Sequence, residues 1–226
     1  LGGEPLINKS FYKLLDFFVE SGHSRDIDLR INTNMTKLTE ETLHKFLVFK
    51  NVNIDFSIDG IEDTYEYIRY PMKWSIINKK IEMLENFLKK FNPKINVYVN
   101  FTVQTYNILH MLEFIDYFLT KGFLPILHPV HHPPYLSIKN TPDSLKPILL
   151  KKLENKIEEL SGKENDKVHL PWVCEKITAL INLIQVPSDP DEIKNFLKFT
   201  KALDGKRNQN FELVSPEISK HFLELV

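Results

Sequence analysis

Residues 27–34 read Ile-Asp-Leu-Arg-Ile-Asn-Thr-Asn, residues 52–58 read Val-Asn-Ile-Asp-Phe-Ser-Ile, and residues 95–103 read Ile-Asn-Val-Tyr-Val-Asn-Phe-Thr-Val. In each stretch apolar and polar residues alternate strictly, which is the pattern of a β-strand with one buried face. A shorter apolar segment predicts a fourth strand at 123–128. The chain therefore has four predicted strands.

Segments with apolar residues at helical spacing lie between the strands, at about 11–18, 43–47, 74–91 and 112–119. Gly22 and Gly122 follow two of them as expected C-caps, and Thr39 precedes another as an expected N-cap. Strands that alternate with helices in this way indicate parallel βαβ units.

The second face of each predicted strand is polar. A doubly wound sheet is covered on both faces, so its strands would be apolar throughout. We therefore predict an α/β fold with helices on one face of the sheet, in the form of an incomplete parallel (β/α) barrel, or partial TIM barrel. Ligands should bind at the carboxyl ends of its strands. The alternative is an antiparallel α+β sheet with one face in water. The polar residues are Asp28, Arg30, Asn32, Asn34, Asn53, Asp55, Ser57, Asp59, Tyr98, Asn100, Thr102 and Gln104.

The remainder of the chain has a mainly helical pattern. Apolar stripes at 153–160, 177–184 and 193–203 predict three helices, Pro216 is expected to open a last short one, and Lys163–Lys167 has the composition of a loop. We divide the chain into a partial barrel at 1–136 and a helical C-terminal extension at 137–226.

Composition excludes several classes of function. The 226 residues carry 29 Lys and Arg against 30 Asp and Glu, and a net charge of −1 argues against nucleic acid or an anionic membrane as the main partner. The single cysteine, Cys174, excludes an intramolecular disulfide and an all-cysteine metal cage within this chain. No apolar run is long enough to span a membrane, and no signal peptide opens the chain. We therefore expect a cytoplasmic protein. We also expect that it has lost its natural N-terminus, because the chain starts at Leu1 and not at Met and enters directly on Gly-Gly-Glu-Pro.

Three groups of residues are candidates for chemistry. Gly2-Gly3-Glu4-Pro5 offers backbone carbonyls and a carboxylate that would suit an ammonium group, although a plain turn is equally compatible. His128, His131 and His132 could bind zinc, but histidines that bond backbone or substrate in a proline-stiffened loop are favoured. Cys174 is expected to be a buried small apolar residue.

The order of these features resembles the radical S-adenosylmethionine (SAM) enzymes. The resemblance covers about residues 1–130: GGEP before a helix, a strand that ends Asn32-Thr33-Asn34, a strand that ends Ser57-Ile58-Asp59-Gly60, then Tyr65 to Arg69, a long helix and a strand with Asn100. Phe199-Thr200-Lys201-Ala202-Leu203-Asp204 with Arg207-Asn208-Gln209 resembles family members described as twitch-domain proteins.

The resemblance implies a role for each matched residue. Gly2, Gly3 and Glu4 would hold the amino group of SAM, and Ser57 and Arg69 would hold its carboxylate. Asn34 and Asp59 would lie where SAM or substrate can be reached. Asn100 and Gln104 would line the barrel interior, and the strand end at Leu127 and His128 would flank the adenine.

The family holds a [4Fe–4S] cluster through a CxxxCxxC loop and cleaves SAM reductively to abstract a hydrogen atom from its substrate. This chain has no such loop, so the resemblance implies that the cluster ligands lie upstream of Leu1 and that the chain alone is inactive. The implied partners are an electron donor such as ferredoxin or flavodoxin and an unknown polar substrate. Two alternatives remain: a metal-dependent barrel hydrolase that uses His128, His131 and His132 with Asp55 or Asp59, and a non-catalytic binding module derived from a barrel.

Overall fold

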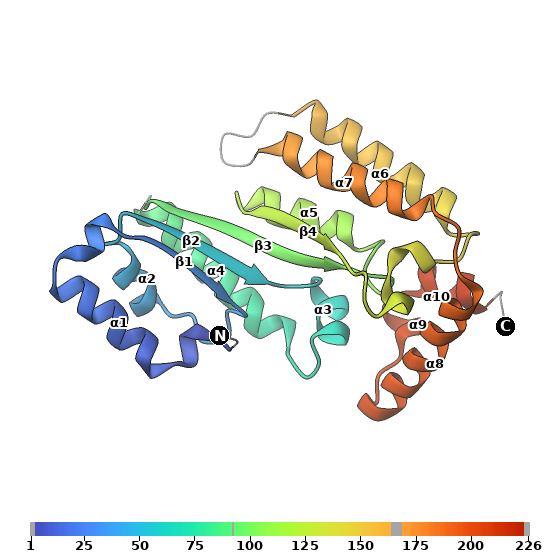
Figure 1. Ribbon diagram of the computed structural model, residues 1–226, viewed down its shortest axis with the longest axis horizontal. Helices are drawn as coiled ribbons and strands as arrows, with labels where there is room; N and C mark the ends of the chain where they lie inside the picture. Colours follow the sequence, from blue (N-terminus) through green and yellow to red (C-terminus); the bar gives the residue numbers. More distant parts are fainter. Residues whose placement is uncertain (1–2, 92, 164–168, 224–226) are drawn as a thin grey trace.

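The structure, a computed structural model, describes residues 3–91, 93–163 and 169–223. Its centre is a sheet of four parallel strands in the order β1-β2-β3-β4 (Figure 1). The register aligns Ile31 with Ile54 and Ile54 with Val97, so the apolar faces of neighbouring strands coincide. The parallel α/β fold is confirmed, and the antiparallel alternative is wrong. The strands are β1 (Asp28–Thr33), β2 (Asn51–Ser57), β3 (Ile95–Val103) and β4 (Leu124–Pro129).

The helices between the strands cover the apolar face of the sheet. Ile77 and Ile81 of α4 and Phe114 of α5 are fully buried in the same core as the strand residues. The strands follow one another in chain order without reversal, which is the progression of a (β/α) barrel and not of a doubly wound sheet. The sheet stays open, and its other face is polar. The elements in this part are η1 (Pro5–Ile7), α1 (Lys9–Glu20), η2 (His23–Asp26), α2 (Glu40–Phe46), α3 (Glu62–Ile68), α4 (Trp74–Phe91) and α5 (Met111–Thr120).

The C-terminal region is helical, as the sequence predicts. Figure 1 shows α6 and α7 side by side, and α7 packs against β4. The last three helices lie at the α3 end of the molecule, far from α1 (Figure 1). Most of the loop predicted at Lys163–Lys167 lies outside the described residues. The elements are η3 (Pro134–Leu136), η4 (Ile138–Asn140), α6 (Lys146–Ser161), α7 (Leu170–Ile184), α8 (Pro190–Arg207), α9 (Phe211–Val214) and α10 (Pro216–Leu223).

An aromatic cluster joins the sheet region to the C-terminal helices. The ring centroid of Tyr106, which follows β3, lies 5.2 Å from that of Tyr67, 4.9 Å from that of Phe196 and 5.0 Å from that of Phe211. All four side chains are buried. Edge and tilted ring contacts of this kind add to the free energy gained by burial.

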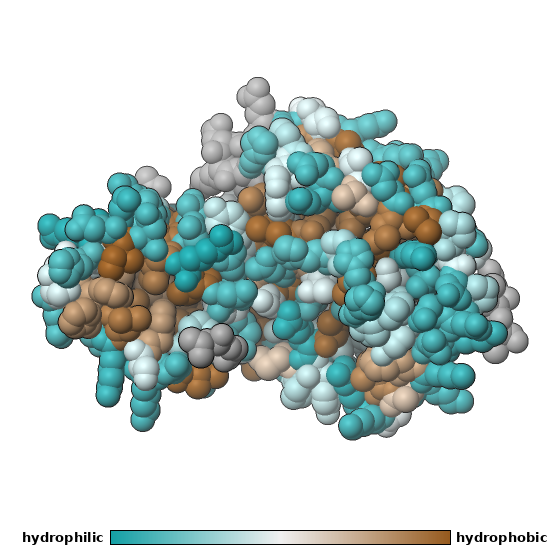
Figure 2. All heavy atoms as spheres, in the orientation of Figure 1, coloured by the Kyte–Doolittle hydropathy of each residue, from teal (hydrophilic) through white to brown (hydrophobic). Residues whose placement is uncertain are grey.

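The surface is mixed in polarity (Figure 2). Exposed apolar side chains gather on η1 and α1, where the side chains of Ile7, Leu14 and Phe17 are about half exposed or more. Among the described residues, no helix has the length and apolar character needed to cross a bilayer.

Candidate functional site

The carboxyl ends of the four strands form a rim of polar side chains. Ser57 at the end of β2 donates a hydrogen bond to Asn32 Oδ1 of β1 at 3.1 Å. Asn100 of β3 is the register partner of Ser57, and its Oδ1 lies 3.1 Å from His128 Nε2 of β4. The polar residues that the sequence assigns to strand ends therefore do meet at one edge of the sheet.

The segment before α1 is attached to this rim through Glu4. Its Oε1 accepts a hydrogen bond from the Thr33 hydroxyl at 2.6 Å, and its Oε2 accepts one from the Asn34 backbone N–H at 2.7 Å. Oε1 also accepts from Leu6 N at 3.2 Å. The carboxylate thus serves first to hold its own segment on the end of β1. Gly3 beside it has a φ of 136°, which favours glycine, and Gly2 lies outside the described residues.

Asn34 has a local structural role as well. Its Oδ1 accepts hydrogen bonds from Thr36 N at 3.0 Å and from the Thr36 hydroxyl at 2.8 Å, which shapes the turn that follows β1. Its own backbone N–H is the group bound by Glu4. The sequence predicts that Gly3, Glu4, Asn34, Ser57 and Asp59 converge on one rim at the carboxyl ends of the strands, and the structure places them there. Their contact with a ligand stays a prediction.

Asp59, two residues after Ser57, forms a partly buried ion pair with Arg69. Arg69 Nε lies 2.7 Å from Asp59 Oδ2, and the side chains are 32% and 8% exposed. Asp59 Oδ1 accepts a further hydrogen bond from Thr102 N at 2.8 Å. Asp59 is therefore occupied with pairing to Arg69 and joining β2 to β3. The Nε atom of Arg69 is buried, while the Arg69 side chain as a whole is partly open to solvent. An arginine held in this way suits a carboxylate ligand.

Asn107 is a residue of the site that sequence reasoning missed. It is fully buried, its amide donates to the carbonyls of Asp59 and Thr102 at 2.9 Å each, and its Oδ1 accepts from Gln104 N at 2.9 Å. It therefore locks the loop after β3 against the loop after β2. Its position in a loop, three residues after Gln104, was the only available signal. Gln104, predicted to line the interior, is itself buried.

Burial also controls the ionisation of a neighbouring phenol. Desolvation raises the pKa of Tyr65 to about 12, although the nearby Arg69 acts in the opposite direction. Tyr65 therefore remains a neutral hydrogen-bonding group near neutral pH. The rim carries the guanidinium of Arg69 and the carboxylates of Glu4 and Asp59.

Polar side chains continue along the same face of the sheet, from the rim at the carboxyl ends of the strands toward their amino ends. Arg30 makes two hydrogen bonds to the buried carboxylate of Asp55, at 2.7 and 2.9 Å, and its guanidinium carbon lies 5.7 Å from the ring centroid of Tyr98. Further along, Asn96 donates to Asn53 Oδ1 at 3.0 Å. These cross-strand pairs present neutral polar surface with few uncompensated charges.

The structure gives no support to a histidine metal centre. Within the residues described, no group of three or more His, Cys, Asp or Glu side chains is close enough to hold a metal ion. His131 and His132 are exposed, and His128 is paired with Asn100. Cys174 is half-buried between α7 and α6 rather than fully buried, with its Sγ 4.0 Å from the Ile157 carbonyl.

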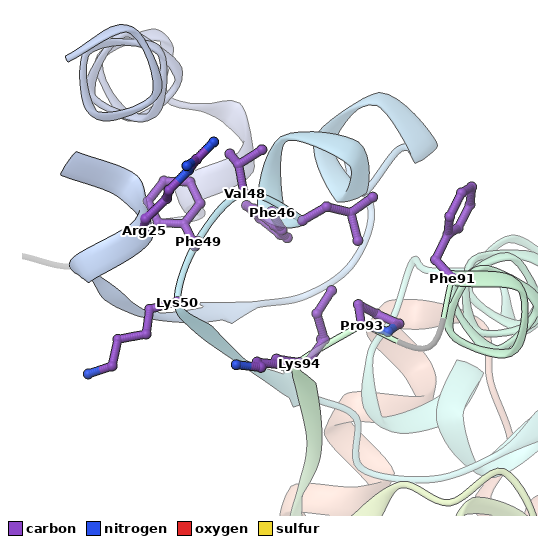
Figure 3. Close-up of a pocket in the computed structure, with 10 residues that line it drawn as sticks. Arg25, Phe46, Val48, Phe49, Lys50, Phe91, Pro93 and Lys94 are labelled. Carbon is purple, nitrogen blue, oxygen red and sulfur yellow. The ribbon is translucent and has the colours of Figure 1, made fainter. Parts of the chain in front are cut away.

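A separate cavity of about 570 Å³ lies at the opposite end of the sheet, at the amino ends of β2 and β3 (Figure 3). Phe46, Phe49 and Phe91 line it together with Arg25, Lys50 and Lys94. The three cationic side chains are exposed, and Figure 3 shows Arg25 and Lys50 pointing in different directions. The cavity is therefore distinct from the rim, and its charges do not converge on one point.

Comparison with known proteins gave matches among solved structures alone: no protein-family model and no curated protein matches this sequence. One similar structure is described as "Native anSMEcpe with bound AdoMet and Cp18Cys peptide", with 18% identity, a TM-score of 0.49, and coverage of 74% of this chain and 48% of that one. A second, a histidine-tagged form of anSMEcpe with bound AdoMet, has the same values. The chain spans about half the length of these structures.

Proposed function

We propose that this chain forms the part of a radical SAM enzyme that binds the amino and carboxylate ends of SAM and faces the substrate. The observation that carries the proposal is the rim, where Arg69 pairs with Asp59, two residues after Ser57, and where Glu4 fixes the Gly3 segment on the end of β1.

Each end of SAM finds a complementary group in this arrangement. A carboxylate can accept hydrogen bonds from the Arg69 guanidinium, and from the Ser57 hydroxyl when that hydroxyl turns to it from Asn32 Oδ1. An ammonium group can donate to backbone carbonyls of the segment that Glu4 holds in place, with the Glu4 charge nearby. Glu4 would thus act largely by positioning the Gly3 backbone.

The chain's own residues do not fit an iron–sulfur cluster. Cluster ligation needs several thiolates, and the only cysteine is Cys174, which is packed between α6 and α7. We propose that the cysteines lie outside this chain, upstream of Leu1, and that an electron donor such as ferredoxin or flavodoxin serves the complete protein. In the family, SAM bound to such a cluster supplies the chemistry that removes a hydrogen atom from the substrate.

The polar face of the sheet supports a polar substrate. Arg30 and Asp55 form an ion pair without net charge, and the Tyr98 ring lies next to Arg30. Asn53 and Asn96 add amide groups to the same face. Such a surface can hydrogen-bond a polar molecule without requiring that it carry a net charge.

The test measures SAM binding by calorimetry, both on this chain and on the chain extended upstream as its gene encodes it. We expect weak or undetectable binding to this chain and no 5′-deoxyadenosine after reconstitution with iron, sulfide and a reductant. In the extended protein, Arg69→Ala should weaken SAM binding about tenfold to a hundredfold, because a charged hydrogen bond contributes about 1.5–3 kcal/mol.

Arg25→Ala is the matched control, because Arg25 is an exposed arginine at the opposite end of the sheet. It should leave SAM binding unchanged. Equal affinity of Arg69→Ala and the unmodified extended protein would overturn the proposal. SAM binding without any SAM cleavage in the extended protein would favour the non-catalytic binding module.

A further inference from the structure

Three polar residues contact one short helix, α3. Asp204 and Arg207 lie in the last turn of α8, and Gln209 follows that helix. Asp204 Oδ1 accepts a hydrogen bond from the Tyr67 hydroxyl at 2.9 Å. Arg207 donates from Nη1 to the Tyr67 carbonyl at 3.2 Å, and Gln209 donates from Nε2 to the Glu66 carbonyl at 3.3 Å. These contacts join segments that lie far apart in the sequence, and they converge on consecutive residues.

The receiving carbonyls belong to the last turn of α3. A helix leaves its final carbonyls without partners inside the helix, so groups that satisfy them fix where the helix ends. Arg207 reaches beyond that end as well, since its guanidinium carbon lies 5.4 Å from the ring centroid of Tyr70. Arg207 therefore spans residues 67 to 70 and contacts the chain on both sides of Arg69.

Asp204 anchors this contact from its own side. Its second oxygen accepts a hydrogen bond from Phe211 N at 3.0 Å, so the start of α9 and the Tyr67 hydroxyl share one carboxylate. Tyr67 is buried against Tyr106 and Phe211, which leaves its hydroxyl little freedom to change partners. The arrangement is thus held by packing and by hydrogen bonds together.

Arg69 itself is the C-cap residue of α3, with its backbone N–H bonded to the Tyr65 carbonyl at 2.8 Å. Its guanidinium reaches Asp59 at the rim. A shift of the last turn of α3 would move the Arg69 backbone relative to Asp59, which β3 holds separately through Thr102.

We propose that Asp204, Arg207 and Gln209 are positioning residues that set the place of Arg69 at the rim. The C-terminal helices thereby act on the ligand site without touching it. The effect on SAM binding rests on the proposed function, whereas the positioning of Arg69 does not.

The first experiment observes Arg69 directly in this chain. The Nε–H signal of Arg69, assigned by its loss in Arg69→Ala, is followed by ¹⁵N NMR in Arg207→Met and in Tyr67→Phe, which removes only the hydroxyl bonded to Asp204. We expect the signal to shift and its exchange with water to become about tenfold faster or more, as the ion pair opens more often. Lys198→Met, an exposed substitution on the same helix, should leave it unchanged.

The second experiment is a double-mutant cycle on SAM binding in the extended protein. Arg207→Met should weaken binding on the order of tenfold when Arg69 is present and should have no effect in the Arg69→Ala background, because coupled residues are not additive. A purely structural loss would weaken binding equally in both backgrounds. An unchanged Arg69 signal in Arg207→Met and Tyr67→Phe, both folded, would overturn this inference, whereas an unaffected affinity in Arg69→Ala alone would overturn the proposed function.

Discussion

Gly60, which follows Asp59 in the turn from β2 to α3, leaves no room for a side chain. A Cβ at this position would lie 2.9 Å from Tyr65 N and 2.9 Å from Thr64 Cγ2. Because the first of these is a backbone atom, the turn would have to move. We expect Gly60→Ala to lower the free energy of unfolding by about 1–3 kcal/mol, as measured by urea denaturation.

Gly205 provides the matched control within α8. A Cβ there would meet nothing within 4 Å. Gly205→Ala should therefore raise the free energy of unfolding by about 0.5–1 kcal/mol, because alanine favours a helix more than glycine does. Equal destabilisation by both substitutions would show that the turn at Gly60 is not tightly packed.

The Asp59–Arg69 ion pair connects the end of β2 to the end of α3. Asp59→Asn keeps an acceptor for Thr102 N but leaves the Arg69 guanidinium with a neutral partner. We expect a loss of about 1–2 kcal/mol in the free energy of unfolding, a modest value because Arg69 is 32% exposed to solvent. Asp28→Asn, at an exposed carboxylate that pairs with Lys50 and accepts a hydrogen bond from Asn51, should lower the urea midpoint much less than Asp59→Asn does. Identical midpoints for the two variants would contradict the structural role of Asp59.

At the scale of elements, strict alternation predicted β1, β2 and β3, because one face of each packs against helices, whereas a shorter apolar segment predicted β4. The helix α3 was missed. Its seven residues, Glu62–Ile68, are too few to show helical periodicity, and its stability comes from contacts with α4 and α9. A pattern within one segment also limits what can be predicted of the site. Ser57 could be placed at the rim because it ends a predicted strand, whereas the hydrogen-bond partners of Glu4 and Asn107 could not be predicted. Those partners depend on hydrogen bonds between loops that are distant in sequence.

Helices α5 and α6 are joined by a buried lysine. Lys156 Nζ lies 2.8 Å from Asp116 Oδ2 of α5 and 2.6 Å from Glu159 Oε2, and its side chain is 7% exposed. The hydrogen bonds from Lys156 and then from Lys163 lower the pKa of Glu159 to about 2 from an ordinary value near 4.5. A depressed acid pKa contributes stability that is complete above about pH 4.5 and is lost as the pH falls toward 2.

We therefore expect Lys156→Met to flatten the acid side of the stability profile. The loss in free energy of unfolding between pH 5 and pH 3 should shrink by roughly 1 kcal/mol or less, because Glu159 is 42% exposed and screened by solvent. At pH 7 the change should be small, since methionine fills a similar volume. Lys151→Met, at an exposed position of α6, is the control and should keep the original slope. An unchanged slope in Lys156→Met would show that the pair does not govern acid stability.

At the scale of the whole molecule, the division at residue 136 separates two regions that share a core. Helix α7 packs on β4, and the Tyr106 hydroxyl lies 2.7 Å from Thr200 Oγ1 in a buried contact between the loop after β3 and α8. Burial raises the pKa of Tyr106 to about 12, so this contact keeps its proton across the ordinary pH range. Two regions with such an interface should unfold together.

The two tryptophans allow this to be measured, because Trp74 lies in α4 and Trp172 in α7. Trp172→Phe leaves fluorescence that reports on the sheet region, and Trp74→Phe leaves fluorescence that reports on the C-terminal helices. We expect the urea unfolding transition seen by fluorescence to coincide with that seen by circular dichroism in each variant. Tyr106→Phe, which removes only the hydroxyl bonded to Thr200, should shift both transitions by the same amount. Separate transitions, or a shift confined to one probe, would show that 1–136 and 137–226 are independent folding units and that the C-terminal helices can move without disturbing the rim.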